Sequence, residues 1–65
     1  MTPPIKIRIT SDDNEMEFIR LVKDAKAKEN CFVYRYTKSE TKLDQEITFT
    51  EIELNKQLSN YFKPL

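Results

Sequence analysis

The stretch of residues 31–37 constrains the fold of this chain more than any other segment. It is the densest run of strand-forming residues in the sequence. Successive side chains of a strand point to opposite faces, so Phe32, Tyr34 and Tyr36 share one face while Arg35 lies on the other. Aromatic side chains that faced outward would form a stacking platform of the kind that binds single-stranded nucleic acid. Because that arrangement turns Arg35 inward, where an unpaired charge is costly, the pattern favours the aromatic residues as core.

The short length of the chain limits the classes of protein to which it can belong. Sixty-five residues predict a single domain, residues 1–65, and a chain of this size buries only about 60% of its unfolded surface. Cys31 is the only cysteine, as is typical of a reducing, intracellular compartment. No apolar stretch resembles a signal peptide or approaches the roughly 20 residues that span a bilayer. We therefore expect a cytoplasmic protein that does not enter a membrane.

Two residue types are absent, and their absence argues against catalysis. The chain has no histidine, which is the commonest general base and zinc ligand. It also has no glycine, which removes the loops that cradle phosphate groups and the tight Asn-Gly hairpin turn. Turns must then be longer or be built from Asn, Asp and Ser. We expect no enzymatic activity, no cofactor and no bound metal.

Residues 5–10 alternate strictly between apolar and polar side chains and predict a half-buried strand. Ile5, Ile7 and Ile9 share one face of this strand. Lys6 and Arg8 lie on the other face, which we expect to be open to water.

Residues 12–29 are predicted to form a helix. Asp12 fits an N-cap and Glu15 stands three residues later, which is the spacing of a capping box. Four apolar residues recur at helical spacing and predict the buried stripe, namely Phe18, Leu21, Val22 and Ala25. Carboxylates in this region could also hold a divalent cation, but capping explains them without a metal; they are Asp12, Asp13, Glu15 and Glu17.

The last third of the chain predicts a loop, a strand and a second helix. Residues 38–45 are polar without periodicity, which indicates a long hairpin loop, and residues 45–50 alternate as a strand. Thr50 and Glu53 have the spacing of a capping box and mark the start of a helix that Pro64 ends. The predicted apolar face of this helix comprises Leu54, Leu58, Tyr61 and Phe62.

These elements predict an α+β fold with the order βαββα. Because a strand–helix–strand unit prefers a right-handed crossover, both helices can pack on one face of a three-stranded sheet. The arrangement is that of a ferredoxin-like fold that lacks its last strand, a statement about geometry and not about family membership.

Two surfaces of this predicted fold are candidates for binding. The open sheet face and the hairpin loop bring basic residues together, and these would suit a phosphate backbone or an acidic protein; they are Lys6, Arg8, Arg35, Lys38 and Lys42. Open antiparallel faces carry such residues by default, however, and the formal net charge of the chain is zero. The second candidate is the first strand, which would lie at the edge of the sheet and expose the backbone of Ile5, Ile7 and Ile9 to a partner.

The sequence therefore favours a small non-catalytic intracellular module for protein–protein interaction or regulation. Its partner would be another protein or a second copy of the chain, bound through the sheet edge or the open face. The small size also suggests an origin in a phage or another mobile element. The alternative is a nucleic-acid-binding protein that uses the basic face and the hairpin loop.

Overall fold

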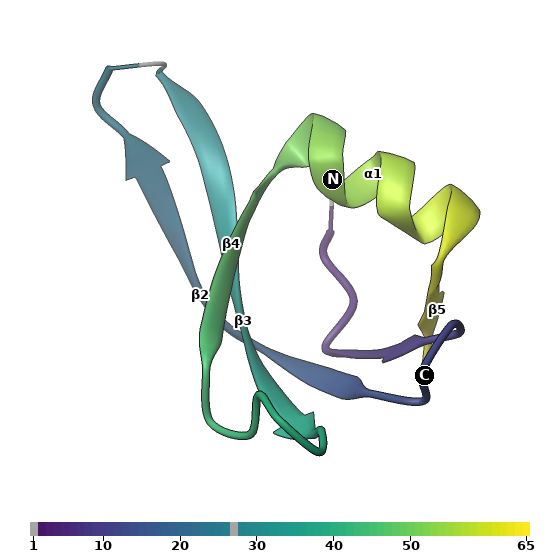
Figure 1. Cartoon of the computed structure of the whole chain (residues 1–65). Helices are drawn as coiled ribbons and strands as arrows, with labels where there is room; N and C mark the ends of the chain where they lie inside the picture. The colour runs from purple at the N-terminus through teal and green to yellow at the C-terminus, as the bar shows by residue number, and fades with distance from the viewer. Residues whose placement is uncertain (1, 27) are drawn as a thin grey trace.

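The described residues form one antiparallel sheet of five strands with a single helix packed on it (Figure 1). The structure, a computed structural model, describes residues 2–26 and 28–65. The elements follow in the order β1 (Lys6–Ile9), β2 (Glu15–Asp24), β3 (Glu29–Lys38), β4 (Glu46–Thr50), α1 (Glu51–Asn60) and β5 (Phe62–Pro64). The strand order across the sheet is β4-β3-β2-β1-β5. The predicted βαββα fold, with three strands and two helices in a truncated ferredoxin-like arrangement, is therefore wrong.

The segment predicted as the first helix is a turn followed by the long strand β2. The backbone N–H of Asn14 donates to Oδ1 of Asp12 at 3.0 Å, and Asp13 has a φ of 59°. Aspartate side chains stabilise tight turns by the same kind of hydrogen bond that caps helices. The acidic segment therefore turns the chain from β1 into β2.

A bulge in β2 accounts for its helix-like pattern. The register with β3 shifts between Phe18 and Arg20, because Ile19 is an extra residue opposite β3. Beyond the shift, Leu21 pairs with Phe32 and so lies on the same face as Phe18. Two core-side residues are thus three positions apart, a spacing that is typical of a helix.

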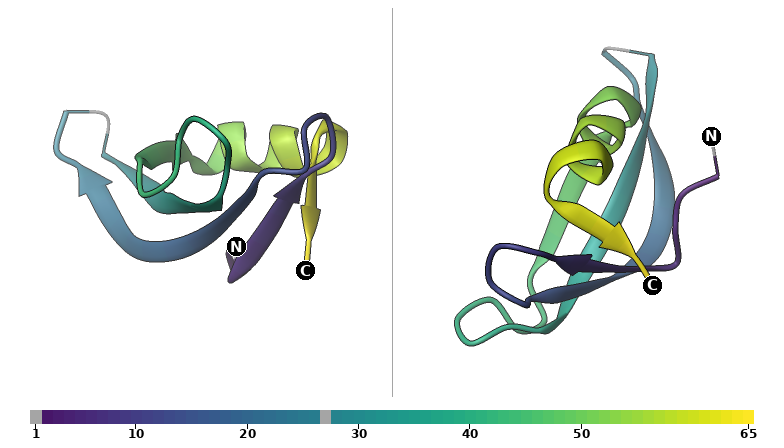
Figure 2. Two further views of the ribbon diagram at one scale, coloured as in Figure 1. Left: turned by 60° about the horizontal axis from the view of Figure 1, so that its bottom comes forward. Right: turned by 90° about the vertical axis from the view of Figure 1, so that its right-hand side faces the viewer.

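The core lies between α1 and the face of the sheet that curves around it (Figure 2). Tyr34, Ile7, Met16 and Leu54 are fully buried there. The prediction for the central strand is confirmed, since Phe32, Tyr34 and Tyr36 are buried while Arg35 is exposed; the aromatic residues are core and not a platform.

Helix α1 begins as predicted and ends earlier. Thr50 is its N-cap and forms a complete capping box with Glu53. The helix stops at Asn60, so Phe62 and Pro64 belong to β5, which pairs with β1. Leu54 is fully buried beneath the helix, whereas Tyr61, predicted on its apolar face, is 55% exposed. A ten-residue helix is marginal by itself in water, so its docking on the sheet stabilises it.

The turns show how a chain without glycine reverses its direction. Among the residues that the structure describes, three have positive φ, namely Asp13 at 59°, Lys28 at 55° and Asp44 at 67°. Each lies between two neighbouring strands of the sheet. Aspartate tolerates this left-handed region better than most residues, but lysine does not. The predicted use of aspartate in turns is confirmed, and Lys28 is the strained exception.

Candidate functional site

The open face of the sheet, opposite α1, carries charges of alternating sign. One row across four strands is formed by Lys6, Glu17, Arg35 and Glu46, each paired in register with the next. Nη2 of Arg35 lies 3.7 Å from Oε1 of Glu17. Nη2 of Arg20 lies 2.9 Å from Oε1 of Glu46, so this ion pair spans β3 from β2 to β4.

A second row on the same face is richer in cations. Glu15 lies between Arg8 and Lys38, at 3.5 Å and 3.8 Å from their nitrogen atoms. Strand β5 adds Lys63 beside Arg8, a residue that the sequence reasoning missed because it assigned this segment to a helix. Charged side chains this exposed interact weakly, at about 0 to 1 kcal/mol per pair.

The structure thus brings four of the five predicted basic residues together and interleaves them with glutamates. Lys6, Arg8 and Arg35 lie on the open face as expected, and Lys38 joins them at its margin. Lys42 does not, because its amino group lies 5.5 Å from the ring centroid of Tyr36, whose side chain belongs to the core face. The glutamates reduce the positive field that would attract a phosphate backbone.

Strand β1 is not an edge of the sheet. It pairs with β2 on one side and with β5 on the other. Ile7 and Ile9 are buried in the core, and only Ile5, at 72% exposure, lies outside it. The predicted edge interface of Ile5, Ile7 and Ile9 therefore lacks the unpaired backbone on which it depended.

An unpaired edge exists instead along the outer half of β2. The register of β1 on β2 ends at Glu17, whereas β2 continues to Asp24. Within the described residues, residues 20–24 pair with β3 on one side, and residues 19–24 pair with no strand on the other. Figure 1 shows this half of the β2–β3 hairpin projecting beyond the rest of the sheet. We call residues 19–24 the β2 edge.

Two prolines explain why β1 stops short. The N–H of Phe18 donates to the carbonyl of Ile5 at 2.8 Å, which is the last contact of this kind along the strand. Pro4 and Pro3 precede Ile5 and have no N–H to continue the ladder. The chain turns toward the core side, where the Tyr34 hydroxyl donates to the Pro4 carbonyl at 2.7 Å. Burial raises the pKa of Tyr34 to about 12 from its usual 10.0.

The β2 edge differs from the other two sheet edges in its exposed apolar side chains. Leu21 is 54% exposed and Val22 is 36% exposed. The edge strand β5 has three residues, one of which is Pro64. Along the other edge strand, β4, the apolar side chains of Ile47 and Phe49 pack in the core. Native sheets usually protect a regular edge with charges or bulges, and the bulge here comes before the exposed stretch.

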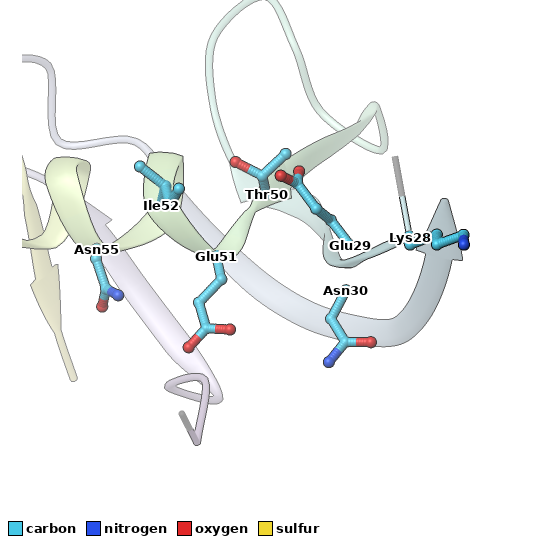
Figure 3. A pocket seen from close by; sticks show the side chains of 7 residues that line it. All are labelled: Lys28, Glu29, Asn30, Thr50, Glu51, Ile52 and Asn55. Carbon is cyan, nitrogen blue, oxygen red and sulfur yellow. The ribbon is translucent and has the colours of Figure 1, made fainter. Parts of the chain in front are cut away.

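Two shallow hollows lie on the core side of the hairpin, and the smaller of them reaches the β2 edge at Leu21. The smaller, of about 300 Å³, is lined by Pro3, Phe18, Leu21, Asn30, Phe32 and Glu51. The larger, of about 390 Å³, is lined by Lys28, Glu29, Asn30, Thr50, Glu51, Ile52 and Asn55. In Figure 3, Asn30 from β3 and Glu51 and Asn55 from α1 point to the same side of the larger hollow. These volumes are at the small end of the range for ligand sites, about 300 to 1,000 Å³.

The acidic segment that could have held a cation is a turn and the start of a strand. Across residues 2–26 and 28–65, no group of three or more His, Cys, Asp or Glu side chains is arranged to hold a metal ion. Glu15 and Glu17 instead form the ion pairs of the open face. In the same part of the chain, no helix has the length and apolar character needed to cross a membrane.

No protein-family model matches the sequence, and no curated protein and no solved structure matches it significantly.

Proposed function

We propose that this chain is a small non-catalytic module that binds another protein by adding a strand to its sheet. The partner would supply an extended segment that pairs with the β2 edge, residues 19–24, in the position that β1 leaves open. The observation that carries the proposal is that β2 continues to Asp24 while its pairing with β1 ends at Glu17. Strand addition of this kind derives its affinity from backbone hydrogen bonds and its specificity from alternate side chains.

The exposed apolar residues on this edge support the proposal. Leu21 and Val22 are adjacent, so they lie on opposite faces of the strand. An added strand would cover both, one on each face, which removes apolar surface from water. The buried, unpaired Cys31 fits a reducing compartment, so we place the module and its partner inside the cell.

Selection from a library of random eight-residue peptides, followed by amide chemical-shift mapping, tests this function. We expect selected peptides to shift the amide signals of residues 19–24 and to protect them from solvent exchange. Peptides that shift another surface instead, such as the exposed side of α1 or the β4 edge, would contradict the proposal.

A pair of leucines provides a matched control. Leu21 on the β2 edge and Leu43 in the β3–β4 loop are 54% and 57% exposed, so changing either one should alter stability by less than about 0.5 kcal/mol. We expect Leu21→Ser, which adds no charge, to weaken the selected peptides about tenfold and Leu43→Ser to leave their affinity unchanged. Equal losses in the two variants would show that the effect is not located at the edge.

A further inference from the structure

The outer half of the β2–β3 hairpin is positively charged although the whole chain is neutral. This half, residues 19–33, contains four basic residues and two acidic residues, Asp24 and Glu29, a net charge of +2, so the remaining residues carry −2. The basic residues are Arg20, Lys23, Lys26 and Lys28. The β2 edge itself carries Arg20 and Lys23 against Asp24, a net charge of +1, and opposite charges on neighbouring strands stabilise a sheet.

The register of β2 fixes what each position of an added strand would meet. On the core side, Leu21 and Lys23 pair with Phe32 and Asn30 of β3 and so share one face. The hollow of about 300 Å³ lies on this face beside Leu21. An apolar side chain beside Leu21 would enter this hollow, and a carboxylate two positions away would face Lys23.

The open face gives the complementary pair of positions. Val22 and Arg20 pair with Cys31 and Val33 of β3 and share the face opposite α1. A β-branched or other apolar residue suits the position beside the exposed Val22. A carboxylate suits the position beside Arg20, where it would extend the alternating row that the Arg20–Glu46 ion pair already forms.

From these four positions we infer that the β2 edge binds an extended acidic segment of a partner protein that reads acidic, apolar, apolar, acidic. The four residues lie beside Arg20, Leu21, Val22 and Lys23, and the pattern is the same in either strand direction. The inference rests on the strand addition proposed above and adds the chemistry of the partner. A second copy of this chain fits poorly, because the two edges have the same charge and the sequence contains no such four-residue pattern.

Three labelled probes test the inference by fluorescence anisotropy at low salt. The first is Thr-Thr-Glu-Val-Leu-Glu-Thr-Thr, the second has lysine in place of both glutamates, and the third is a single-stranded oligonucleotide of twelve mixed bases. We expect the acidic peptide to bind about tenfold more tightly than the lysine peptide, because both of its charged pairs are attractive. The difference should shrink as salt is added.

Charge reversal at one position gives the matched control. Lys23→Glu should reverse the order of the two peptides or abolish their difference. Lys56→Glu makes the same change on α1, far from the proposed contact in sequence, and should leave the tenfold ratio unchanged. An equal effect of both variants would show that only net charge matters and would overturn the inference.

The remaining outcomes separate this inference from the function on which it rests. If both peptides shift the amides of residues 19–24 with equal affinity, strand addition stands and the acidic preference is wrong. If neither peptide shifts them, both proposals fail. Tighter binding of the oligonucleotide, with shifts at Arg8, Arg35 and Lys63, would overturn both in favour of nucleic-acid binding. Sedimentation analysis could instead detect a dimer. If its dissociation shifts the amide signals of the β2 edge, the edge binds a second copy of the chain, and the inferred partner segment is wrong.

Discussion

Replacing Leu54 with alanine tests how the sheet is closed. Strands β4 and β5 are the two edges of the sheet and do not pair with each other; α1 connects them and packs against both. Leu54 is the one fully buried side chain among the described residues of α1, at 0% exposure. Removing a buried leucine side chain costs about 2 to 5 kcal/mol, from the lost burial and the cavity that remains.

That cost is large compared with the stability expected for so short a chain. At about 0.05 to 0.15 kcal/mol per residue, a chain of 65 residues has a free energy of unfolding of about 3 to 10 kcal/mol. We therefore expect Leu54→Ala to remove at least about a fifth of the total stability, and about half of it near the middle of both ranges. With a denaturant slope of about 1 to 2 kcal/mol/M, the midpoint of urea unfolding should fall by about 1 to 5 M.

The assay is urea unfolding followed by far-UV circular dichroism, with Ile52→Ala as the control. Ile52 lies on the same helix and is 74% exposed, so its replacement should change the free energy of unfolding by less than about 0.5 kcal/mol. If Leu54→Ala does not fold, the half-buried Leu58 provides a milder probe, and Leu58→Ala should cost more than Ile52→Ala. Equal costs for the buried and exposed positions would refute the docking of α1 on the sheet.

Three further changes test the core, a turn and the helix start. Since burial raises the pKa of Tyr34 to about 12, only the unfolded chain loses this proton between pH 10 and 12, and stability should fall by about 1 to 3 kcal/mol as the pH rises through that window. Subtracting the pH titration of tyrosinate absorbance in Tyr34→Phe from that of the unchanged protein isolates the ionisation of Tyr34. Its midpoint should lie near pH 12, whereas a midpoint near 10 would mean that the hydroxyl is open to water. Lys28→Gly should raise the free energy of unfolding by about 1 kcal/mol, measured in urea, because glycine accepts the φ of 55° without strain. Lys28→Ala keeps a Cβ atom and should not raise it. An equal increase in the two variants would contradict backbone strain at this position. Thr50→Ala should lower it by about 0.5 to 2 kcal/mol in the same assay through loss of the helix cap, while no change would mean that the cap adds nothing to stability.

The strands with unbroken alternation were predictable from the sequence. Residues 31–37 lie inside β3 with the aromatic side chains buried, and residues 45–50 overlap β4 with Phe49 in the core. The first strand was also correct, although Ile5 is outside it. In these segments the period of two is intact, so the buried face can be identified without knowing which strands are neighbours.

Strand β2 was mistaken for a helix for two physical reasons. The aspartates before it satisfy both a helix cap and a tight turn, because the same short side chain accepts backbone hydrogen bonds in each. The bulge at Ile19 then places Phe18 and Leu21, three residues apart, on one face. Only the pairing of β2 with its neighbours, which is not local in sequence, distinguishes the two structures.

Strand β5 was missed because it has no pattern of its own. It has three residues and follows α1 after a single residue, so Phe62 continued the apolar spacing of the helix. Its pairing with β1 joins the two ends of the chain and changes β1 from an edge into an interior strand. The error in one short strand therefore placed an interior strand at the edge of the predicted sheet.

The basic face was predicted in part. Alternation correctly placed Lys6, Arg8 and Arg35 on the side away from the core. The glutamates between them could not be foreseen, because Glu15 and Glu17 had been assigned to a helix cap. The electrostatic potential over a sheet face can be predicted only when the strand order is known, since neighbouring strands supply the opposing charges.

Amide hydrogen exchange along β2 tests the proposed edge most directly, because it requires no knowledge of the partner. Residues 15–17 lie between β1 and β3, whereas the β2 edge has a neighbour on one side only. In dilute protein we predict slow exchange at residues 15–17 both for amides that point toward β1 and for amides that point toward β3. At residues 20–24 we predict fast exchange of the alternate amides that point away from β3. The acidic peptide should slow exchange of those alternate amides. Slow exchange of every amide through residue 24 in the free monomer would show that the edge is already covered, and would contradict strand addition at this site.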